Sequence, residues 1–450
     1  MSYLQGLANQ KIAVLGAGVT GTAVLDFLVT RGINADLFDE KAPHAKRSVE
    51  ENYDLAIVSP GWRLDNPIVL ALQSVGCELL SEIDFAWKVK EEIAPGQKWI
   101  ALTGTNGKTT TIQMVQSIFD YSSMRGIACG NVGEPVISVL NSGDRYDYLA
   151  LELSSFQLEW SQYARYEAVA LLNIAPDHID WHGSFDLYAS AKLRLLDASE
   201  IAVINGEDSE SVLRASAWSG KKVFYFLDTP QPGELGLVEN LLIDRAFVSD
   251  PSVAHDFAQL SDIRPTVPHN VSNAMAAAGL GRAIGITHEE IRQGLQNFTL
   301  DRHRLEVVLE EDGIAWVNDS KATNPHAAAA ALMSQISSIW IAGGLAKGAA
   351  MNPLIERCAS RIKAAILIGQ DAPIIATALS KEAPHIPYYL MPYSGDSQEL
   401  MREVVAKARE LAVAGDSVLL APACASMDQF KDYADRGEKF VAAIREVIGR

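Results

Sequence analysis

Apolar runs of strand length alternate with segments of helical periodicity along most of the chain. Over the first 95 residues, strands are predicted at KIAVLGAG, ADLFDE, LAIVSPG and CELLSE, and helices at TAVLDFLVTRG and after Pro67. Strands that alternate with helices in this way are typical of a parallel sheet, because each crossover helix returns the chain to the same edge.

This pattern restarts twice. EEIAPGQK, residues 91–98, is a charged break containing Pro and Gly, so we place a boundary near residue 95. Strands are then predicted at YDYLALEL, AVALLNI and IAVIN, with a helix over 270–285. A third block begins near residue 300, with strands predicted at GIAWVND, SIWIAGG, AAILIG and SVLLAPA. The sequence therefore predicts three α/β domains, over residues 1–95, 96–300 and 301–450.

Composition narrows the class of protein. A chain of 450 residues is too long for one hydrophobic core, and 48% hydrophobic with 21% charged residues is an ordinary folded composition. The net charge of −18 argues against nucleic acid or an anionic membrane as partner, so any anion site must be locally basic. No signal-peptide pattern or run of 18 apolar residues occurs, so we expect a cytoplasmic protein. Reduced, buried thiols are expected at Cys77, Cys129, Cys358 and Cys424.

WIALTGTNGKTTTIQMVQSIF, residues 99–119, predicts a strand, a tight turn and a helix. Gly104 and Gly107 leave room for an anion to reach the backbone at the positive end of the helix. Lys108 would then reach the β- and γ-phosphates, and the Thr109 hydroxyl would bind magnesium. The usual P-loop glycine six residues before the lysine is replaced by Leu102, so an ordinary strand–turn–helix stays an alternative.

Carboxylates and histidines cluster after the next two strands. Glu152 ends a strand beside the P-loop, where a magnesium ligand belongs; the alternative is a helix cap beside Ser154. NIAPDHIDWHG, residues 173–183, permits a zinc site, but no second Cys–His cluster completes it. We expect His178 to bind or orient a second magnesium ion and His182 to lie at the surface.

Lys192 lies in LYASAKLRLLD, a predicted helix with Leu187, Leu195 and Leu196 on its apolar side. Spacing alone makes Lys192 a solvated lysine.

Two further motifs follow strands. GAGVTG, residues 16–21, fits G-x-G-x-x-G, and Asp39 ends the next strand, which leaves NAD, another nucleotide or a purely structural turn open; the P-loop favours another nucleotide. WVNDSKATNPHA, residues 316–327, places hydroxyls and a lysine where α/β proteins bind ligands, as an anion clamp requires. LAPACASMDQF, residues 420–430, brings Ser426 and Gln429 to the end of another strand of that sheet.

Taken together, these motifs resemble the Mur ligase family over nearly the whole chain. GTNGKTT, LELSSFQLE, NIAPDHIDWHG, HNVSNAMAA, HRLE, NDSKATN and APACASMDQF occur in that family's order, and the shifted glycine is its own form of the P-loop. The resemblance implies a Rossmann-like N-terminal domain, a central P-loop ATPase-type domain and a C-terminal Rossmann-like parallel sheet. It also implies ATP-dependent amide ligation: phosphorylation of a carboxylate gives an acyl phosphate, which an amine attacks.

SPG at residues 59–61 and DQF at 428–430 favour the branch that adds D-glutamate to UDP-N-acetylmuramoyl-L-alanine in peptidoglycan synthesis. The expected protein is a monomer without nucleic-acid or membrane partners. Sister ligases for L-alanine, a diamino acid or a dipeptide, and folylpolyglutamate-type ligases, stay open. So do a P-loop switch that hydrolyses ATP without an amino acid and an NAD oxidoreductase.

The resemblance also implies a role for each matching residue. The catalytic set is Lys108, Glu152, His178 and Lys192, the last carbamylated. Two magnesium ions are expected on Thr109, Glu152, His178 and Lys192. ATP contacts are expected from Gly104, Thr105, Asn106, Gly107, Lys108, Thr109 and Thr110, from Asn270 and Asn273 beside adenine, and from Arg304 and Asp319 toward phosphates and ribose. The uridine nucleotide is expected at Val19, Thr20 and Asp39, its sugar–peptide part at Asn131, and D-glutamate at Lys321, Thr323, Lys347, Ser426 and Tyr433.

Overall fold

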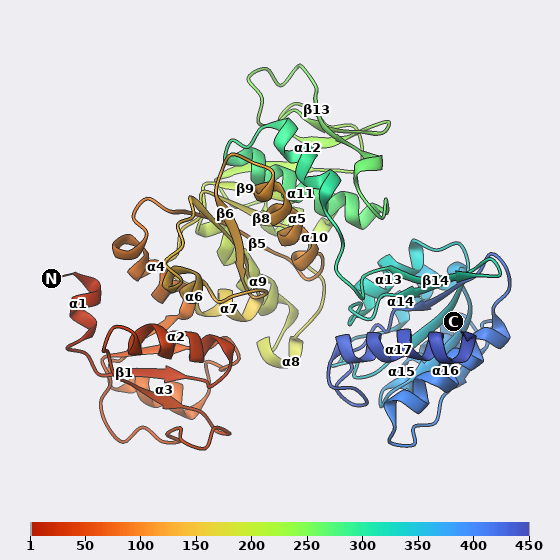
Figure 1. Cartoon of the computed structure of the whole chain (residues 1–450), viewed down its shortest axis with the longest axis horizontal. Coiled ribbons are helices and arrows are strands. Elements are labelled where there is room, and N and C mark those ends of the chain that lie inside the picture. Colours follow the sequence, from red (N-terminus) through yellow and green to blue (C-terminus); the bar gives the residue numbers. More distant parts are fainter. Residues whose placement is uncertain (1, 450) are drawn as a thin grey trace. The chain divides into compact units, whose positions relative to one another are not determined.

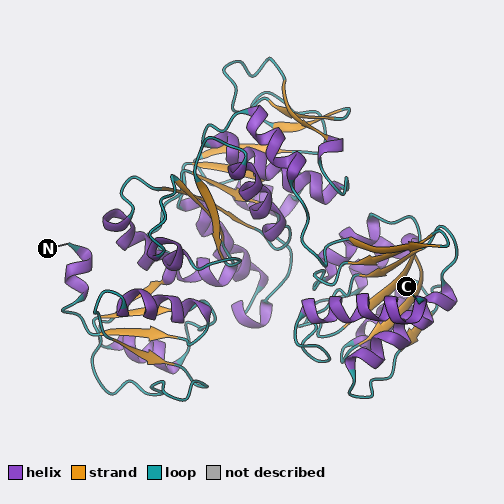
Figure 2. Cartoon of the chain, in the orientation of Figure 1, coloured by secondary structure: helices purple, strands orange, loops and turns teal. Residues whose placement is uncertain are grey.

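The computed structural model describes residues 2–449, which contain three β-sheets flanked by helices (Figure 1, Figure 2). The chain folds into two compact units. The first unit comprises the chain up to Ile174, Gly183–Thr266 and Asn270–Phe298. The second unit comprises Ala175–His182, Val267–His269 and the chain from Thr299 onward. The mixed α/β class with mainly parallel sheets is confirmed, while the boundaries near residues 95 and 300 stay predictions. No helix within residues 2–449 is long and apolar enough to cross a bilayer.

The first sheet has the strand order β2-β1-β3-β4, with every pair parallel, as the sequence predicts. Its strands are β1 (Ile12–Leu15), β2 (Ala35–Phe38), β3 (Leu55–Val58) and β4 (Glu78–Ser81). Its helices are α1 (Tyr3–Leu7), α2 (Val19–Val29), α3 (Pro67–Ser74) and α4 (Glu82–Ile93).

The second sheet has nine strands in the order β13-β12-β11-β10-β9-β8-β5-β7-β6. Strand β5 lies between β8 and β7, so the segments that follow these three parallel strands meet at one edge. The strands are β5 (Lys98–Thr103), β6 (Gly126–Gly130), β7 (Tyr148–Glu152), β8 (Ala168–Leu171), β9 (Ile201–Asn205), β10 (Lys221–Tyr225), β11 (Leu235–Val238), β12 (Leu241–Asp244) and β13 (His255–Gln259). The helices are α5 (Lys108–Asp120), α6 (Val136–Asn141), α7 (Ser155–Trp160), α9 (Phe185–Asp197), α10 (Ser209–Ala215), η1 (Leu260–Asp262), α11 (Pro268–Ala283) and α12 (His288–Asn297). The short helix α8 (Ile179–His182) belongs to the second compact unit.

The third sheet has the order β14-β15-β19-β16-β17-β18, and β14 is an antiparallel edge on an otherwise parallel sheet. Helices cover both faces, which gives two separate hydrophobic cores. The strands are β14 (Glu306–Glu311), β15 (Ile314–Asn318), β16 (Ser338–Gly343), β17 (Ile362–Ile368), β18 (Tyr388–Leu390) and β19 (Ser417–Leu420). The helices are α13 (Pro325–Met333), α14 (Asn352–Cys358), η2 (Ala359–Arg361), α15 (Ala372–Glu382), α16 (Ser397–Leu411) and α17 (Tyr433–Ile448).

Two buried carboxylates on α4 join the first sheet to the second. Asp84 is fully buried and accepts backbone N–H bonds from the three consecutive residues 162–164, at 2.6–3.0 Å. Glu82 accepts the N–H of Ile137 at 2.6 Å, at the start of α6. The two sheets also share one hydrophobic cluster, so they belong to a single unit. The prediction of reduced, buried thiols is confirmed at Cys77, Cys129, Cys358 and Cys424.

Candidate active site

The P-loop segment forms the predicted strand, turn and helix. Gly107 is the N-cap of α5 with φ of 84°, a conformation that glycine adopts without strain. A Cβ at this position would lie 2.4 Å from Oδ1 of Asn273, so any side chain here would displace Asn273 as well. Lys108 folds back over the turn, and its Nζ donates to the carbonyls of Gly104 at 2.7 Å and Thr105 at 2.9 Å. The turn therefore has the form of a phosphate cradle with its lysine in place.

Asn173, two residues after the end of β8, supports this turn, although the sequence analysis assigns it no role. Its side-chain Oδ1 accepts the N–H of Asn106 at 2.8 Å, and its Nδ2 donates to the carbonyl of Asn106 at 3.1 Å. The backbone carbonyl of Asn173 accepts the N–H of Thr105 at 2.9 Å. Only its place after a strand adjacent to β5 marks this residue in the sequence.

Glu152 lies at the end of β7, in register with Leu102 of β5, and is 1% exposed. Its Oε1 accepts a bond from Nδ2 of Asn131 at 2.8 Å, whereas its Oε2 is buried with no hydrogen-bond partner within residues 2–449. An unpaired buried carboxylate oxygen suits a hard cation. The helix-cap alternative fails, because Ser154 and Gln157 form the capping box of α7. The contact of Asn131 with the sugar–peptide part stays a prediction.

Lys192 is buried, so the expectation of a solvated lysine, based on spacing, is wrong. Its side chain is 1% exposed, and Nζ donates to the carbonyl of Gly104 at 2.8 Å. One turn earlier on α9, the hydroxyl of Tyr188 shares a hydrogen bond of 2.8 Å with Oγ1 of Thr105. Helix α9 therefore packs its lysine and tyrosine against the P-loop, and Leu187, expected on the apolar side, is 57% exposed instead.

Asn270 and Asn273 lie on α11 and are buried. Asn270 donates from Nδ2 to the carbonyl of Pro265 at 3.1 Å. Asn273 lies against Gly107, as its contact with a Cβ built there indicates. Both asparagines belong to the unit that contains the P-loop, and their predicted contacts with adenine stay predictions.

In the second unit, His178 lines the same cavity as Thr323 and Lys347, two residues of the predicted D-glutamate pocket (the acceptor pocket). Pro176–Ile179, Thr323 and Lys347 line a cavity of about 140 Å³. His178 has φ of 51°, and its backbone N–H donates to Oδ1 of Asp177 at 2.9 Å. His182 is buried, contrary to expectation, and its ring packs against that of Trp181 with centroids 4.6 Å apart.

Within residues 2–449, no three His, Cys, Asp or Glu side chains come close enough to form a metal site, which leaves the zinc reading without support.

The segments that follow β15 and β19 contain most of the other residues predicted to bind D-glutamate. Lys321 places Nζ 5.0 Å from the ring centroid of Tyr433, a cation–π contact. Ser426 is 3% exposed and begins the turn after β19, where its carbonyl accepts the N–H of Phe430 at 2.9 Å. Gln429 also follows β19, and its Oε1 is buried without a partner among the described residues. The structure thus brings Lys321 and Tyr433 together.

Arg436 of α17 underlies these loops and was also missed by the sequence analysis. It is fully buried, and its guanidinium donates to the Ser320 hydroxyl at 3.0 Å and to the carbonyls of Ser320, Cys424 and Gly343 at 2.8, 3.1 and 3.4 Å. These carbonyls follow or end three neighbouring strands, so one side chain fixes three loops. An arginine on a predicted helix carries no sequence signal for such a role.

Arg304 and Asp319 also lie in the second unit. Asp319 accepts the N–H of Leu305 at 3.3 Å. Burial raises the pKa of Asp319 to about 6, and the nearby Arg304 guanidinium opposes that rise. Arg304 is flanked by two non-glycine residues with positive φ, His303 and Leu305. Their contacts with ATP stay predictions.

The glycine turn of the first sheet is shaped by Asp39. Its Oδ2 accepts the N–H of Ala17 at 2.9 Å, and its Oδ1 accepts the N–H groups of Lys41 and Ala42, which holds the Asp39 pKa below its usual value. Ser59 lies beside this turn, with Oγ 2.8 Å from a Cβ built at Gly16, and that oxygen is buried without a partner in the described chain.

Ser59 is therefore a candidate ligand group that the sequence analysis used only as a branch marker. Val19 is 74% exposed at the start of α2, followed by Thr20.

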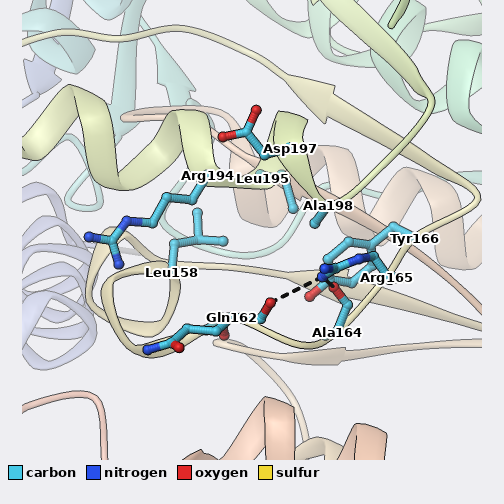
Figure 3. A pocket seen from close by; sticks show the side chains of 10 residues that line it. Leu158, Gln162, Ala164, Arg165, Tyr166, Arg194, Leu195, Asp197 and Ala198 are labelled. Atoms are coloured by element: carbon cyan, nitrogen blue, oxygen red, sulfur yellow. Dashed lines mark hydrogen bonds between the residues drawn. The ribbon is translucent and has the colours of Figure 1, made fainter. Parts of the chain in front are cut away.

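A cavity of about 310 Å³ lies beside the end of α9 (Figure 3). Its walls are the segment 158–166 and the end of α9. Arg165 donates from Nη1 to three backbone carbonyls, and Arg194 pairs with Glu159 at 2.8 Å. Both guanidinium groups are engaged by the protein, and no predicted site residue lines this cavity.

Similarity to known proteins extends over nearly the whole chain. Residues 102–281 match the family described as the Mur ligase middle domain, and residues 303–424 match the Mur ligase glutamate ligase domain. The chain is 42% identical over 470 residues to the UDP-N-acetylmuramoylalanine--D-glutamate ligase of Thermobifida fusca (strain YX), covering 98% of this chain and 100% of the relative. It is 40% identical to the ligase of the same name from Streptomyces coelicolor, covering 98% of each.

Solved structures share the fold at lower identity. A pseudomurein peptide ligase type C from Methanothermus fervidus superposes with a TM-score of 0.61 at 19% identity, covering 98% of this chain and 99% of the other. A MurF ligase from Thermotoga maritima, solved in complex with ADP, gives a TM-score of 0.60 at 15% identity, covering 100% and 97%. These similarities show that the chain shares its multi-domain α/β fold with those ligases.

Proposed function

The chain belongs to the Mur ligase family, and we propose that it uses ATP to join D-glutamate to UDP-N-acetylmuramoyl-L-alanine through an acyl phosphate. The observation that carries this proposal is the 42% identity, over essentially the full length of both chains, to a ligase of that name. Such an enzyme acts in peptidoglycan precursor synthesis, and hence in cell-wall formation, cell shape and division. We place it in the cytoplasm, as a monomer acting on small molecules.

The chemistry requires a carboxylate to lose an oxygen, which it does not do at neutral pH. Transfer of the γ-phosphoryl group from ATP makes the leaving group phosphate instead of oxide, and amine attack then yields an amide, ADP and phosphate. Phosphoryl transfer between anions depends on alignment and charge neutralisation. Lys108 over the P-loop supplies a positive charge, and the first turn of α5 supplies backbone N–H donors.

The donor set fits magnesium. Oε2 of Glu152 is buried without a protein partner within residues 2–449, and Thr109 lies in the first turn of α5, directly after the P-loop lysine. When bound, magnesium neutralises phosphate charge. Two ions would be held by Thr109, Glu152, His178 and a carbamylated Lys192.

Carbamylation of Lys192 is supported by its burial beside the P-loop, where a carboxylate made from carbon dioxide would be shielded from water. Activity that depends on bicarbonate is expected. Full activity after rigorous depletion of carbon dioxide would contradict the modification while leaving the ligase assignment intact.

The remaining contacts follow the same proposal. Lys321, Lys347, Thr323 and Ser426 supply cations and hydroxyls for the two carboxylates of D-glutamate, with Tyr433 beside Lys321. Val19, Thr20 and Asp39 contact the uridine nucleotide, and Asn131 the sugar–peptide part. Asn270, Asn273, Arg304 and Asp319 complete the ATP site.

The test is phosphate release from ATP in the presence of UDP-N-acetylmuramoyl-L-alanine, with D-glutamate, L-glutamate, D-alanine, L-alanine, lysine and diaminopimelate added in turn. Release only with D-glutamate is expected, and Lys108→Ala should abolish it. Release with a different amino acid would keep the ligase chemistry and overturn the acceptor pocket. Release without any amino acid would favour a nucleotide-driven switch.

A further inference from the structure

We propose that Asn173 is a positioning residue that sets the conformation of the phosphate loop and decides which backbone N–H groups meet the ATP phosphates. The inference rests on the proposed use of ATP by this chain. It concerns a side chain to which neither the motifs nor the family resemblance gives a role.

The contact is a matched pair of hydrogen bonds. The Asn173 amide accepts from the N–H of Asn106 at 2.8 Å and donates to the carbonyl of the same residue at 3.1 Å. Only one orientation of the amide satisfies both bonds, because Oδ1 can only accept and Nδ2 can only donate. Together with the bond from Thr105 N–H to the Asn173 carbonyl, this arrangement extends the pairing of β5 and β8 into the loop.

The arrangement divides the N–H groups of the loop into two sets. Those of Thr105 and Asn106 are directed at Asn173, so they are committed to the protein. The N–H groups from Gly107 to Thr110 belong to the first turn of α5, where a helix provides no intrahelical acceptor. Gly107 as N-cap has no side chain to cap them. The phosphates are therefore expected to meet the set from Gly107 to Thr110.

Asn173 is itself anchored in the sheet. The preceding residue, Leu172, lies 2.8 Å through its Cβ from a Cβ built at Gly104, and its carbonyl accepts a bond from Nδ2 of Asn205 at 3.0 Å. Asn205 ends β9 and otherwise accepts the N–H of Glu207. Asn205 lies at the same edge of the sheet and binds the carbonyl of Leu172, next to Asn173, but neither of these hydrogen bonds reaches the P-loop. It is therefore a matched control for Asn173.

The experiment compares Asn173→Ala with Asn205→Ala in the full-length protein. Loss of two hydrogen bonds to the loop is expected to raise the KM for ATP, and the Kd of Mg-ADP measured by calorimetry, by roughly tenfold. The KM for D-glutamate should stay within twofold, and hydrogen exchange of residues 103–111 should accelerate. Asn205→Ala should leave the KM for ATP within twofold of the wild type.

A second variant keeps the test decisive if the alanine protein does not fold. Asn173→Asp preserves the shape and the acceptor but places a carboxylate oxygen against the carbonyl of Asn106, so it should weaken Mg-ADP at least as much. Wild-type affinity for Mg-ADP in a folded Asn173 variant, or an equal loss in Asn205→Ala, would overturn the proposal. A wild-type protein that binds Mg-ADP but does not consume D-glutamate would overturn the proposed function instead.

Discussion

The guanidinium of Arg436 donates from Nη2 to the carbonyl of Ser320 at 2.8 Å, in a site that no solvent reaches. Its contacts are carbonyls and one hydroxyl, and burial lowers its pKa to about 10. A buried cation held in this way is costly, so its value lies in the loops that it orders. Those loops carry Lys321, Lys347 and Ser426.

Arg436→Lys should therefore raise the KM for D-glutamate by tenfold or more, because an ammonium keeps the charge but cannot bond three loops at once. Arg436→Met should also lower the free energy of unfolding by about 3 kcal/mol, since buried carbonyls lose their donors. Steady-state kinetics and denaturant unfolding measure the two effects. Arg402→Lys, at an exposed arginine, is the control. An unchanged D-glutamate KM in Arg436→Lys would show that the loops hold their shape without the planar donor.

Gly107→Ala should reduce ATP affinity by more than a hundredfold. The new Cβ would lie 2.4 Å from Oδ1 of Asn273, at a positive φ that disfavours alanine. Gly96→Ala serves as control, because Gly96 has φ of 80° and an added Cβ meets nothing within 4 Å. The control variant carries the backbone strain alone, so the difference in unfolding free energy between the two isolates the clash, and Mg-ADP binding should weaken only in Gly107→Ala. Similar binding by both variants would contradict the role given to the Gly107–Asn273 contact.

Glu152→Gln should lower kcat by at least a hundredfold and shift magnesium activation to higher concentration. The glutamine amide keeps an oxygen that can accept the bond from Asn131. It loses the negative charge and the second carboxylate oxygen, Oε2, to which the cation is proposed to bind. Magnesium titrations of activity measure the shift, and Glu134→Gln at an exposed position is the control. Unchanged magnesium dependence in Glu152→Gln would remove this residue from the metal site.

The sequence predicts most strands that position the site, because buried parallel strands are continuous apolar runs between turn residues. Gly107 and Lys108 are also recognisable in the sequence, because a phosphate-binding turn needs those residue types at that spacing. The antiparallel strands β11–β13 escaped prediction, since strands of only four or five residues are too short to show a clear periodicity.

Residues whose roles depend on long-range contacts were the ones missed. Lys192 looks like a surface lysine until α9 is packed against the P-loop, and Arg436 looks like any helical arginine until three strand ends meet around it. Asn173 forms its hydrogen bonds with the backbone of Asn106, which lies 67 positions earlier in the chain. Periodicity reports local structure, so it carries no information about such partners.

The buried carboxyl group of Glu82 should make the free energy of unfolding depend on pH. Burial raises its pKa from 4.5 to about 7, while the N–H groups of Ile137 and Val136 oppose the rise. The folded state thus binds the proton more tightly than the unfolded state, so this group's contribution is most favourable below pH 4.5. The contribution falls as pH rises to about 7, by about 3 kcal/mol in the free energy of unfolding.

Glu82→Gln keeps the acceptor for the Ile137 N–H and removes the ionisation. The variant should match the wild type near pH 4.5 and exceed its unfolding free energy by up to about 3 kcal/mol at pH 8. Denaturant unfolding across this range measures the difference, with Glu403→Gln on the exposed face of α16 as control. A constant offset between Glu82→Gln and wild type at every pH would mean that Glu82 stays ionised in the folded protein, held by the N–H groups at the start of α6.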